Sequence, residues 1–407
     1  MSAASDAISE TTPATTPRQR RREVALLFLR LGFTAFGGPA AHVAMMEDEV
    51  VTRRRWIDRQ HFLDLLAAIN FVPGPNSTEL AIHLGLIRAG RAGLVIAGVC
   101  FIVPAVLIIL PLAWVYCAYG TGPNALPHVE GMMSAIGACV LAIIAAALWR
   151  FARTGIRDAF TTTIAIAVAG IGFLPPRYTG YQPELVSLAL SALAGAIWYG
   201  RPRAPGSARA ALLVLGTPLW DPDLGRLGLF FLKVGATLFG SGYVLVSYLK
   251  SGLVDQFQWL TEAQLLDAIA IGQITPGPLL TTATFAGYLI GYTTFDGGVS
   301  GGVAGAVIAT VAIFLPSFLF ILVLGPLLQR IRTNRYARGA LDGMNAAVVA
   351  LILVVTIGLA GASFFPGGQL HLGNVVLAVT ALAALLALHL NSTWVVLIGG
   401  VVGWMLW

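Results

Sequence analysis

Long apolar segments run along nearly the whole chain, separated by short clusters of charged residues, glycine and proline. They are too long for strands and are bounded by residues that end helices, so we predict a helix over each of them. In the first part of the chain the predicted segments are 24–46, 61–83, 92–118, 131–150, 159–174 and 184–200. In the second part they are 228–250, 264–290, 303–328, 340–362, 372–389 and 392–407. The pattern therefore predicts an all-α protein.

The apolar pattern also predicts whether the chain lies in water or in a lipid bilayer. From Gly343 to Trp407 there is no Asp, Glu, Lys or Arg, and at 1.5 Å per residue such a stretch would cross a hydrocarbon core of about 30 Å roughly three times. Of the 407 residues, 57% are hydrophobic and 11% are charged, whereas soluble chains carry about 25% charged residues. This composition excludes a soluble globular enzyme and predicts an integral membrane protein surrounded by a lipid bilayer.

The sequence contains two related copies of one pattern. A shift of 203 positions aligns Phe36-Gly37 with Phe239-Gly240, and Pro73-Gly74-Pro75 with Pro276-Gly277-Pro278. After the triplets the shift becomes 212, because the second copy has gained nine residues around 287–302. Such a repeat indicates two homologous halves. We expect a disordered basic tail at 1–23, a first half at 24–200, a linker at 201–225 and a second half at 226–407.

Basic residues in the loops predict that the two halves have opposite orientations. Lys and Arg stay mainly on the cytoplasmic side of a membrane. The loop 51–60 is rich in arginine and its counterpart 254–262 has no basic residue, whereas the loop 120–130 has none and its counterpart is rich in arginine. The arginines concerned are Arg53, Arg54, Arg55 and Arg59, and then Arg330, Arg332, Arg335 and Arg338. Corresponding loops would thus face opposite sides, as in an inverted repeat.

We expect about ten transmembrane helices and two broken or re-entrant helices, interrupted at Pro73 and Pro276. The orientation of segment 24–46 stays open. The basic tail, with arginines at 18 and 20–22, and the loop 51–60 both favour the cytoplasm although this segment lies between them. Either the segment is a hairpin bent at 36–39, or one of the two loop assignments is wrong.

The two Pro-Gly-Pro triplets mark a candidate anion site. A half-helix that begins at membrane depth points its free N–H groups and positive dipole end at whatever lies in front of it. The alternative is that the prolines only kink two helices, but broken helices at matching places in two repeats are typical of transporter binding sites. The candidate binding residues at and near the triplets are Asn70, Pro73, Gly74, Pro75, Asn76, Ser77, Thr78, Gln273, Pro276, Gly277, Pro278, Thr281 and Thr282.

Glu79 follows the first triplet, and its counterpart in the second half is Thr282. An ionisable group within an apolar segment is a functional candidate, and Glu79 could carry a proton. Alternatively, it only complements the first turn of a helix, where acidic residues are common. An ionised carboxylate would repel a dianion, so a proton switch is consistent with an anion site.

Glycines in the repeated Phe-Gly motif are further candidates. Gly37, Gly38, Gly240 and Ser241 supply bare backbone, which permits either close helix packing or exposed N–H groups that face an anion.

Two cations precede these motifs at matching positions. Arg30 and Lys233 would be costly within an apolar segment unless they are paired, so they are candidate counter-charges for an anionic substrate. The alternatives are snorkelling to the interface or ion pairs with Asp64 and Asp267.

No chemistry beyond transport is indicated. The three cysteines and six histidines are dispersed, so we predict no metal site and no disulfide framework. The chain contains no nucleophile elbow, Walker loop, dinucleotide fingerprint or His-Glu-x-x-His motif. We therefore expect no enzyme activity, no cofactor and no nucleic-acid partner, and a homodimer stays open.

The repeated motifs resemble a known family. Phe36-Gly37-Gly38-Pro39 precedes a basic loop, and residues 73–79 read PGPNSTE, while 273–283 of the second half read QITPGPLLTTA. Together they resemble the long-chain, two-domain form of the chromate ion transporter family, from about Phe28 to Trp407. The resemblance implies efflux of chromate across the bacterial inner membrane, driven by the proton gradient or the membrane potential, and chromate resistance. It leaves sulfate, another tetrahedral oxyanion, or an anion channel as alternatives.

Overall fold

The computed structural model describes residues 16–120, 128–174, 183–200, 224–240, 242–295, 297–327, 331, 333–365 and 368–406. Over these residues the chain forms fifteen α-helices and no strand, which confirms the predicted all-α class. Most of the predicted linker, the predicted site residue Ser241, and Arg330 and Arg332 lie outside the described residues.

The first part of the chain contains seven of the described helices. Their bounds are α1 (Pro17–Thr34), α2 (Gly38–Glu47), α3 (Arg59–Ile69), α4 (Asn76–Val115), α5 (Val129–Gly155), α6 (Ala159–Gly172) and α8 (Pro183–Gly200). Two π-helical turns follow α2 and α4, namely η1 (Asp48–Arg53) and η2 (Tyr116–Gly120). α1 includes the last residues of the predicted tail, because Pro17 starts the helix and Thr16 and Gln19 form a capping box.

The second part contains the other eight described helices. They are α9 (Leu224–Thr237), α10 (Val244–Leu249), α11 (Glu262–Ile274), α12 (Thr282–Thr293), α13 (Gly298–Leu324), α15 (Arg335–Phe364), α16 (Leu372–Ala387) and α17 (Ser392–Leu406). Short elements among them are the π-helical η3 (Lys250–Gln256) and the 3₁₀ turns η4 (Leu279–Thr281) and η5 (Gly325–Leu327). The predicted breaks at the two Pro-Gly-Pro triplets are confirmed, since α3 and α11 end before them and new helices start after them.

The predicted segment 24–46 is divided into two helices. The φ angles of Gly37 (105°) and Gly38 (78°) lie in the left-handed region, which favours glycine. After this bend the chain returns along α1, since Nη2 of Arg30 lies 2.5 Å from Oε1 of Glu49, just beyond α2. The segment is thus a bent hairpin, so the basic tail before it and the arginine-rich loop after it can lie on the same face of the membrane. Segment 228–250 is likewise divided, into α9 and α10.

α4 is a hairpin of two antiparallel arms. The backbone leaves the helical conformation at Ala89 and Gly90. A Cβ on Gly85 would lie 2.3 Å from the carbonyl oxygen of Gly93, so the two arms touch through glycine backbone. In the second half the same hairpin is made by α12 and α13, where a Cβ on Gly287 would lie 2.5 Å from the carbonyl oxygen of Gly305.

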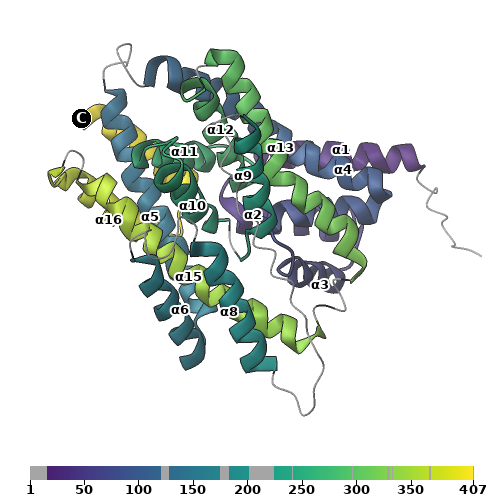
Figure 1. The fold of residues 1–407 in the computed structure, drawn as a ribbon. Coiled ribbons are helices and arrows are strands. Elements are labelled where there is room, and N and C mark those ends of the chain that lie inside the picture. The colour runs from purple at the N-terminus through teal and green to yellow at the C-terminus, as the bar shows by residue number, and fades with distance from the viewer. Residues whose placement is uncertain are drawn as a thin grey trace, which may run out of the picture.

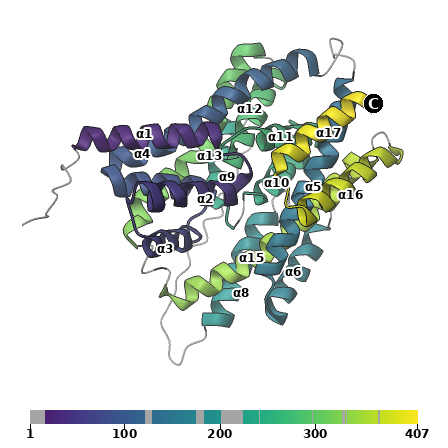
Figure 2. The same cartoon turned by 180° about the vertical axis from the view of Figure 1, so that it is seen from behind.

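The helices form two bodies, and both bodies contain parts of both halves (Figure 1). We call α5, α6, α8, α15, α16 and α17 the outer bundle, and the remaining helices the break-containing body. Seen from the back, α1, α2, α3 and the first arm of α4 lie at one end of the molecule and the outer bundle at the other, with α9 to α12 between them (Figure 2). Each half therefore contributes three helices to the outer bundle.

Helices of the outer bundle are exchanged between the halves. α8 of the first half packs along α15 of the second, and α17 of the second half packs along α5 of the first. Glycines allow the close approach: a Cβ on Gly195 would lie 2.1 Å from the carbonyl oxygen of Gly339, and one on Gly403 would lie 2.7 Å from that of Gly131. Contacts of this kind are typical of helices packed in a membrane.

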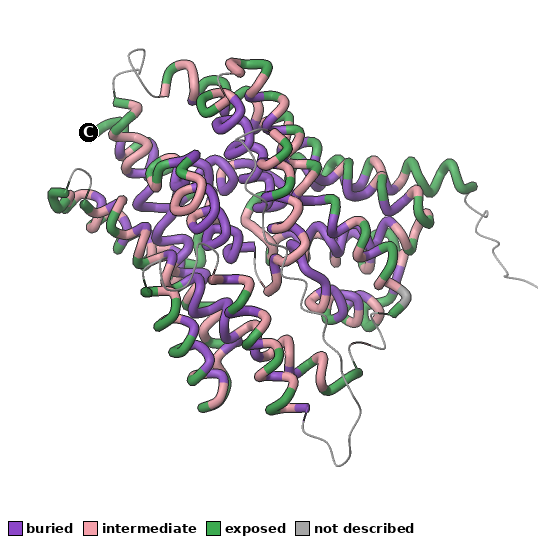
Figure 3. Tube along the Cα trace, in the orientation of Figure 1, coloured by how far each residue is buried: buried purple, intermediate pink, exposed green. Residues whose placement is uncertain are grey.

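The distribution of burial fits a membrane protein. Four described helical stretches are long and apolar enough to cross a membrane, at 76–120, 129–155, 298–324 and 335–364. The first of these contains the α4 hairpin, so it includes more than one arm. Exposed apolar side chains cover the outward faces of the peripheral helices, whereas α10, α11 and α12 are buried along almost their whole length (Figure 3). The broken helix of the second half and the first turns of α4 therefore lie in the protein interior.

Candidate functional site

The two Pro-Gly-Pro breaks are buried and are tied to the opposite half. The backbone N–H of Gly74 donates to the carbonyl oxygen of Leu238 at 2.7 Å, and the N–H of Gly277 donates to that of Ala35 at 3.1 Å. Gly74 and Gly277 are equivalent in the repeat, and so are Ala35 and Leu238. Each break is therefore closed against the Phe-Gly motif of the other half, in a two-fold arrangement.

The first break is stabilised locally by two asparagines. Nδ2 of Asn76, the first residue of α4, donates to Oδ1 of Asn70 at 2.8 Å, and Nδ2 of Asn70 donates to the carbonyl oxygen of Leu66 at 3.1 Å. Pro73, Gly74 and Pro75 between them are buried. Asn70 thus completes the end of α3, and its predicted role in binding a ligand stays a prediction.

Glu79 lies on the first turn of α4, against Gly74. Its side chain is fully buried, and neither carboxyl oxygen has a hydrogen-bond partner among the described residues. The hydroxyls of Ser77 and Thr78 are also buried and unpartnered there. A Cβ on Gly74 would lie 2.3 Å from Oε1 of Glu79 and 2.5 Å from Oγ of Ser317, so Ser317 of α13 faces the same point from the other half.

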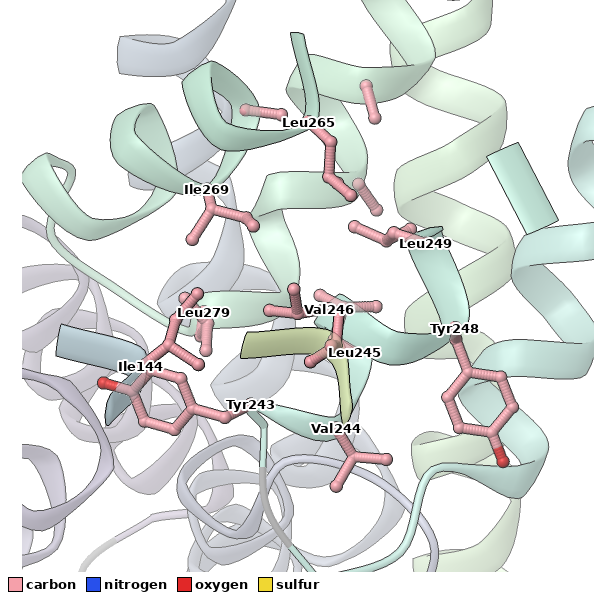
Figure 4. Close-up of a cluster of buried hydrophobic side chains, with 14 of the residues drawn as sticks. Ile144, Tyr243, Val244, Leu245, Val246, Tyr248, Leu249, Leu265, Ile269 and Leu279 are labelled. Carbon is pink, nitrogen blue, oxygen red and sulfur yellow. The ribbon is translucent and has the colours of Figure 1, made fainter. Parts of the chain in front are cut away.

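The second break is lined by neutral polar groups. Oγ1 of Thr281 donates to the carbonyl oxygen of Pro278 at 2.8 Å, while Oγ1 of Thr282 is buried and has no described partner. Nε2 of Gln273 lies 3.5 Å from the hydroxyl of Tyr243. Figure 4 shows the ring of Tyr243 beside Leu279, at the start of the half-helix. This break thus offers hydroxyl and amide donors without a charge.

A small polar cavity lies between the second break and the first Phe-Gly motif. Its volume of about 10 Å³ is room for one water molecule. The residues around it are Ala35, Gly37, Gly38, Pro39, Tyr243, Gly272, Gln273, Thr275, Gly277 and Leu279. This volume is too small for a tetrahedral oxyanion.

A second, larger cavity of about 600 Å³ lies between the end of α4, α5, α11 and α17, and Ile274 in its wall stands two residues before Pro276. Its walls are aliphatic and aromatic, with residues such as Leu112, Ile136 and Trp404. It offers no set of donors for an oxyanion, and we assign it no role in substrate binding.

Glycines at the breaks adopt conformations that other residues avoid. The φ angles of Gly74 (139°), Gly277 (102°) and Gly240 (85°), like those of Gly37 and Gly38, are positive. Gly37 is also crowded, since a Cβ there would lie 2.8 Å from Nδ2 of Asn391. Backbone conformation and close packing together explain why glycine stands at these positions.

The two predicted counter-charges have carboxylate neighbours outside the breaks. Arg30 is exposed and forms an ion pair with Glu49. Lys233 is partly buried and interacts electrostatically with Glu184 of α8. The two aspartates predicted as alternative partners have other contacts. Asp64 accepts a hydrogen bond from Gln60, and Asp267 accepts one from Tyr116.

Glu49 is the centre of an arginine cluster in the loop after α2. Besides Arg30, its carboxylate binds Nη1 of Arg53 at 3.2 Å and Nε of Arg54 at 3.0 Å. Burial raises the pKa of Glu49, but the hydrogen bonds and positive charges of Arg30 and Arg54 outweigh it, so the pKa lies below its ordinary value of 4.5. The cluster holds the arginine-rich loop against α1.

Several residues of the site escaped the sequence reasoning. Ser317 follows Pro316, which is the repeat counterpart of Pro104, so the counterpart of Ser317 is Ala105. A Cβ on Gly277 would lie 3.1 Å from Cβ of Ala105, just as one on Gly74 would meet Ser317. The repeat itself was therefore the signal that could have identified Ser317. Tyr243 had no such signal, because its counterpart is Ala40.

The start of each half-helix offers hydrogen-bond donors to an anion. The first N–H groups of α4 and of the η4–α12 segment have no partner within their own helix, as at any helix start, and they lie near buried hydroxyls. Among the described residues, no group of three or more His, Cys, Asp or Glu side chains is placed to hold a metal ion. The geometry suits reversible binding of an oxyanion.

Comparison with known proteins agrees with this geometry. The sequence profile described as "Chromate transporter" matches the chain twice, at residues 22–197 and 225–404. The chain is 33% identical to a chromate transport protein of Pseudomonas aeruginosa, with 98% of this chain and 96% of the relative covered. It is 30% identical to a chromate transport protein of Cupriavidus metallidurans, with 91% and 89% covered.

A probable chromate transport protein of Synechococcus elongatus is 30% identical, with 84% of this chain and 86% of the relative covered. No solved structure gives a significant match. The double match covers nearly the whole chain, from the first helices to the last. The chain therefore belongs to the chromate transporter family, in its two-domain form.

Proposed function

We propose that this protein exports chromate from the bacterial cytoplasm across the inner membrane, driven by the proton gradient or the membrane potential, and that it confers chromate resistance. The observation that carries the proposal is the reciprocal pairing of the two breaks, Gly74 with Leu238 and Gly277 with Ala35. This pairing brings two half-helix starts to the centre of the protein, where their N–H groups would bind a dianion. The names of the relatives suggest that the dianion is chromate.

The two halves are proposed to act as an inverted repeat. Besides the loop charges, an exchanged ion pair supports this view. Nε of Arg59 lies 3.2 Å from Oε1 of Glu47, and Nζ of Lys250 lies 3.1 Å from Oε1 of Glu262. In the repeat Glu47 corresponds to Lys250 and Arg59 corresponds to Glu262, so the acidic and basic positions of the ion pair are exchanged between the halves. Such an exchange is expected where one loop faces the cytoplasm and the other does not.

Alternating access would follow from this symmetry. The polar cavity at the second break is too small for an oxyanion in this structure, and Glu79 and Ser317 occupy the space beside Gly74 at the first break. Opening one break toward one face while the other stays closed would move the anion across the membrane without a continuous pore.

Two alternatives remain from the sequence. Sulfate or another tetrahedral oxyanion has the same charge and shape as chromate, and an anion channel would use the same donors. Transport into inverted membrane vesicles tests all three: we expect labelled chromate to accumulate under an imposed proton gradient or potential, and excess sulfate to compete only weakly.

The vesicles need a matched control. Gly170→Ala in α6 is suitable because a Cβ at Gly170 has no heavy atom within 4 Å. Accumulation of sulfate in place of chromate would refute the proposed substrate. A flux that only dissipates gradients and does not saturate would indicate a channel. Cells that express the protein should also accumulate less chromate than cells without it.

A further inference from the structure

One side chain of the first half joins both helices of the second break. Tyr116 starts the π-helical turn η2 at the end of α4 and is buried. Its hydroxyl donates to Oδ2 of Asp267 on α11 at 2.6 Å. Its ring packs edge-on against Phe285 of α12, with 5.2 Å between the ring centroids. Tyr116 thus contacts the helix before the triplet 276–278 and the helix after it.

α11 and α12 also touch one another where they approach the triplet. A Cβ on Gly272 would lie 2.2 Å from Oγ1 of Thr282, so the end of α11 lies directly against the start of α12. Gly272 and Gln273 of α11 also line the small polar cavity at this break. The size of that cavity therefore depends on where α11 is held, and Tyr116 holds it at a second place further from the triplet.

The apolar cavity of about 600 Å³ leaves space beside α11. Ala270, Ile271 and Ile274 of α11 form part of its wall, and so does Tyr116. A helix enclosed in a close-packed interior moves only if its neighbours repack, whereas a cavity at its side permits a small displacement. The hydrogen bond from Tyr116 fixes the position of Asp267, and with it the position of α11 beside this space.

The corresponding contact cannot form at the first break. The repeat counterpart of Tyr116 is Leu328, which has no hydroxyl, and the counterpart of Asp267 is Asp64. Asp64 is partly buried and accepts a hydrogen bond from Gln60 of its own helix at 3.2 Å. The two breaks therefore differ in how the helix before the triplet is held.

We propose that Tyr116 is a positioning residue of the second break, which its hydrogen bond to Asp267 holds in the narrow arrangement seen here. When this bond breaks, α11 can move relative to α12, and the polar cavity beside Gly277 can widen. When the bond forms again, the cavity narrows. The inference rests on the proposed function, because the widened cavity is the one that would admit an oxyanion.

Thiol labelling of the full-length protein in nanodiscs tests this role without any chromate. In a protein whose three cysteines have been replaced, Leu279→Cys places a thiol in the wall of the polar cavity, where Leu279 is 6% exposed. Tyr116→Phe keeps the ring but removes one hydrogen bond, so it should increase the labelling rate about tenfold. Tyr199→Phe is the matched control, since the hydroxyl of Tyr199 also donates to an aspartate, Asp158, but in the outer bundle. It should leave the rate unchanged.

Variants of Asp267 show whether the hydrogen bond itself is responsible. Asp267→Asn keeps an acceptor oxygen for the hydroxyl and should label at nearly the wild-type rate, whereas Asp267→Ala should label as fast as Tyr116→Phe. Tyr116→Phe and Asp267→Ala combined should be no faster than either alone, because both remove the same bond. Additive effects would overturn the proposal. A wild-type labelling rate in Tyr116→Phe would do so even if Asp267→Ala fails to fold.

Chromate distinguishes positioning from a general loss of stability. Where the wider arrangement is more populated, the anion binds at a lower concentration, so Tyr116→Phe should need several-fold less chromate than Tyr199→Phe to slow labelling of the thiol. Equal chromate concentrations for the two variants, with faster labelling of Tyr116→Phe, would indicate destabilisation only and overturn the proposal. If chromate slows labelling in no variant and is not transported, the proposed function fails, and the labelling rates of the Tyr116 and Asp267 variants still decide the role of Tyr116.

Discussion

Gly74 donates its backbone N–H to the carbonyl oxygen of Leu238. The equivalent residues of the repeat make the same hydrogen bond, from the N–H of Gly277 to the carbonyl oxygen of Ala35. Each bond joins the broken helix of one half to the Phe-Gly motif of the other. The two breaks are therefore mechanically linked, because a movement that opens one Phe-Gly motif strains the break of the opposite half. Such a link would couple the movements of the two halves in the alternating access proposed above.

Replacing the break glycines should impair both stability and transport. Alanine at a positive φ costs about 1–3 kcal/mol, so Gly277→Ala should lower the unfolding free energy by this amount. Gly74→Ala should cost more, because its Cβ would also collide with Glu79 and Ser317. Denaturant unfolding in detergent measures both, with Gly170→Ala as the control. Equal stability of Gly74→Ala and wild type would contradict the packing at the first break.

Glu79 should govern the pH dependence of transport. Glu79→Gln keeps the size of the side chain but cannot exchange a proton, so chromate accumulation by this variant should no longer vary with pH. Glu184 is the comparison, since it is also buried but lies in α8 of the outer bundle, where it interacts electrostatically with Lys233 of α9. We expect Glu184→Gln to retain the pH profile of the wild type. The reverse result would assign the proton to Glu184.

Glu49 should make the protein less stable in acid. Because its pKa is lower in the folded state than its ordinary value of 4.5, it stabilises the fold above that pH, and the contribution is lost as the pH falls through the folded-state pKa. Glu49→Gln should lose about 1.5–3 kcal/mol at neutral pH, the range for hydrogen bonds to charged groups. Its unfolding free energy should then change less between pH 7 and pH 4 than that of the wild type. A parallel decline in both proteins would exclude Glu49 as the group responsible.

The inverted orientation of the halves predicts opposite labelling of two equivalent loop residues. Arg55 and Gln258 are counterparts, both are exposed, and their φ angles are 50° and 53°. In a protein whose three cysteines have been replaced, Arg55→Cys should react with an impermeant maleimide only from the cytoplasmic side, and Gln258→Cys only from the other. Labelling of both from one side would show that the halves are parallel.

Local features of the sequence were sufficient to predict much of the fold. Apolar segment length predicted the long helices, and the two breaks were visible because proline cannot continue a helix interior and glycine tolerates a positive φ. The turn of the α4 hairpin at Ala89 and Gly90 falls in the gap between the predicted segments 61–83 and 92–118. The partners of Arg30 and Lys233 were missed, because Glu49 and Glu184 are brought to them by bends and by helix exchange.

By itself the sequence determined the membrane environment, the two related halves, the places of the breaks, and Glu79 as the acid without a counterpart. These follow from the order of residues and their local conformational preferences. Only the tertiary structure decided that each break binds the opposite half and that Ser317 lies beside Gly74 together with Glu79. Contacts between distant segments depend on how close-packed helices fit together through glycine backbone, and no local pattern encodes that fit.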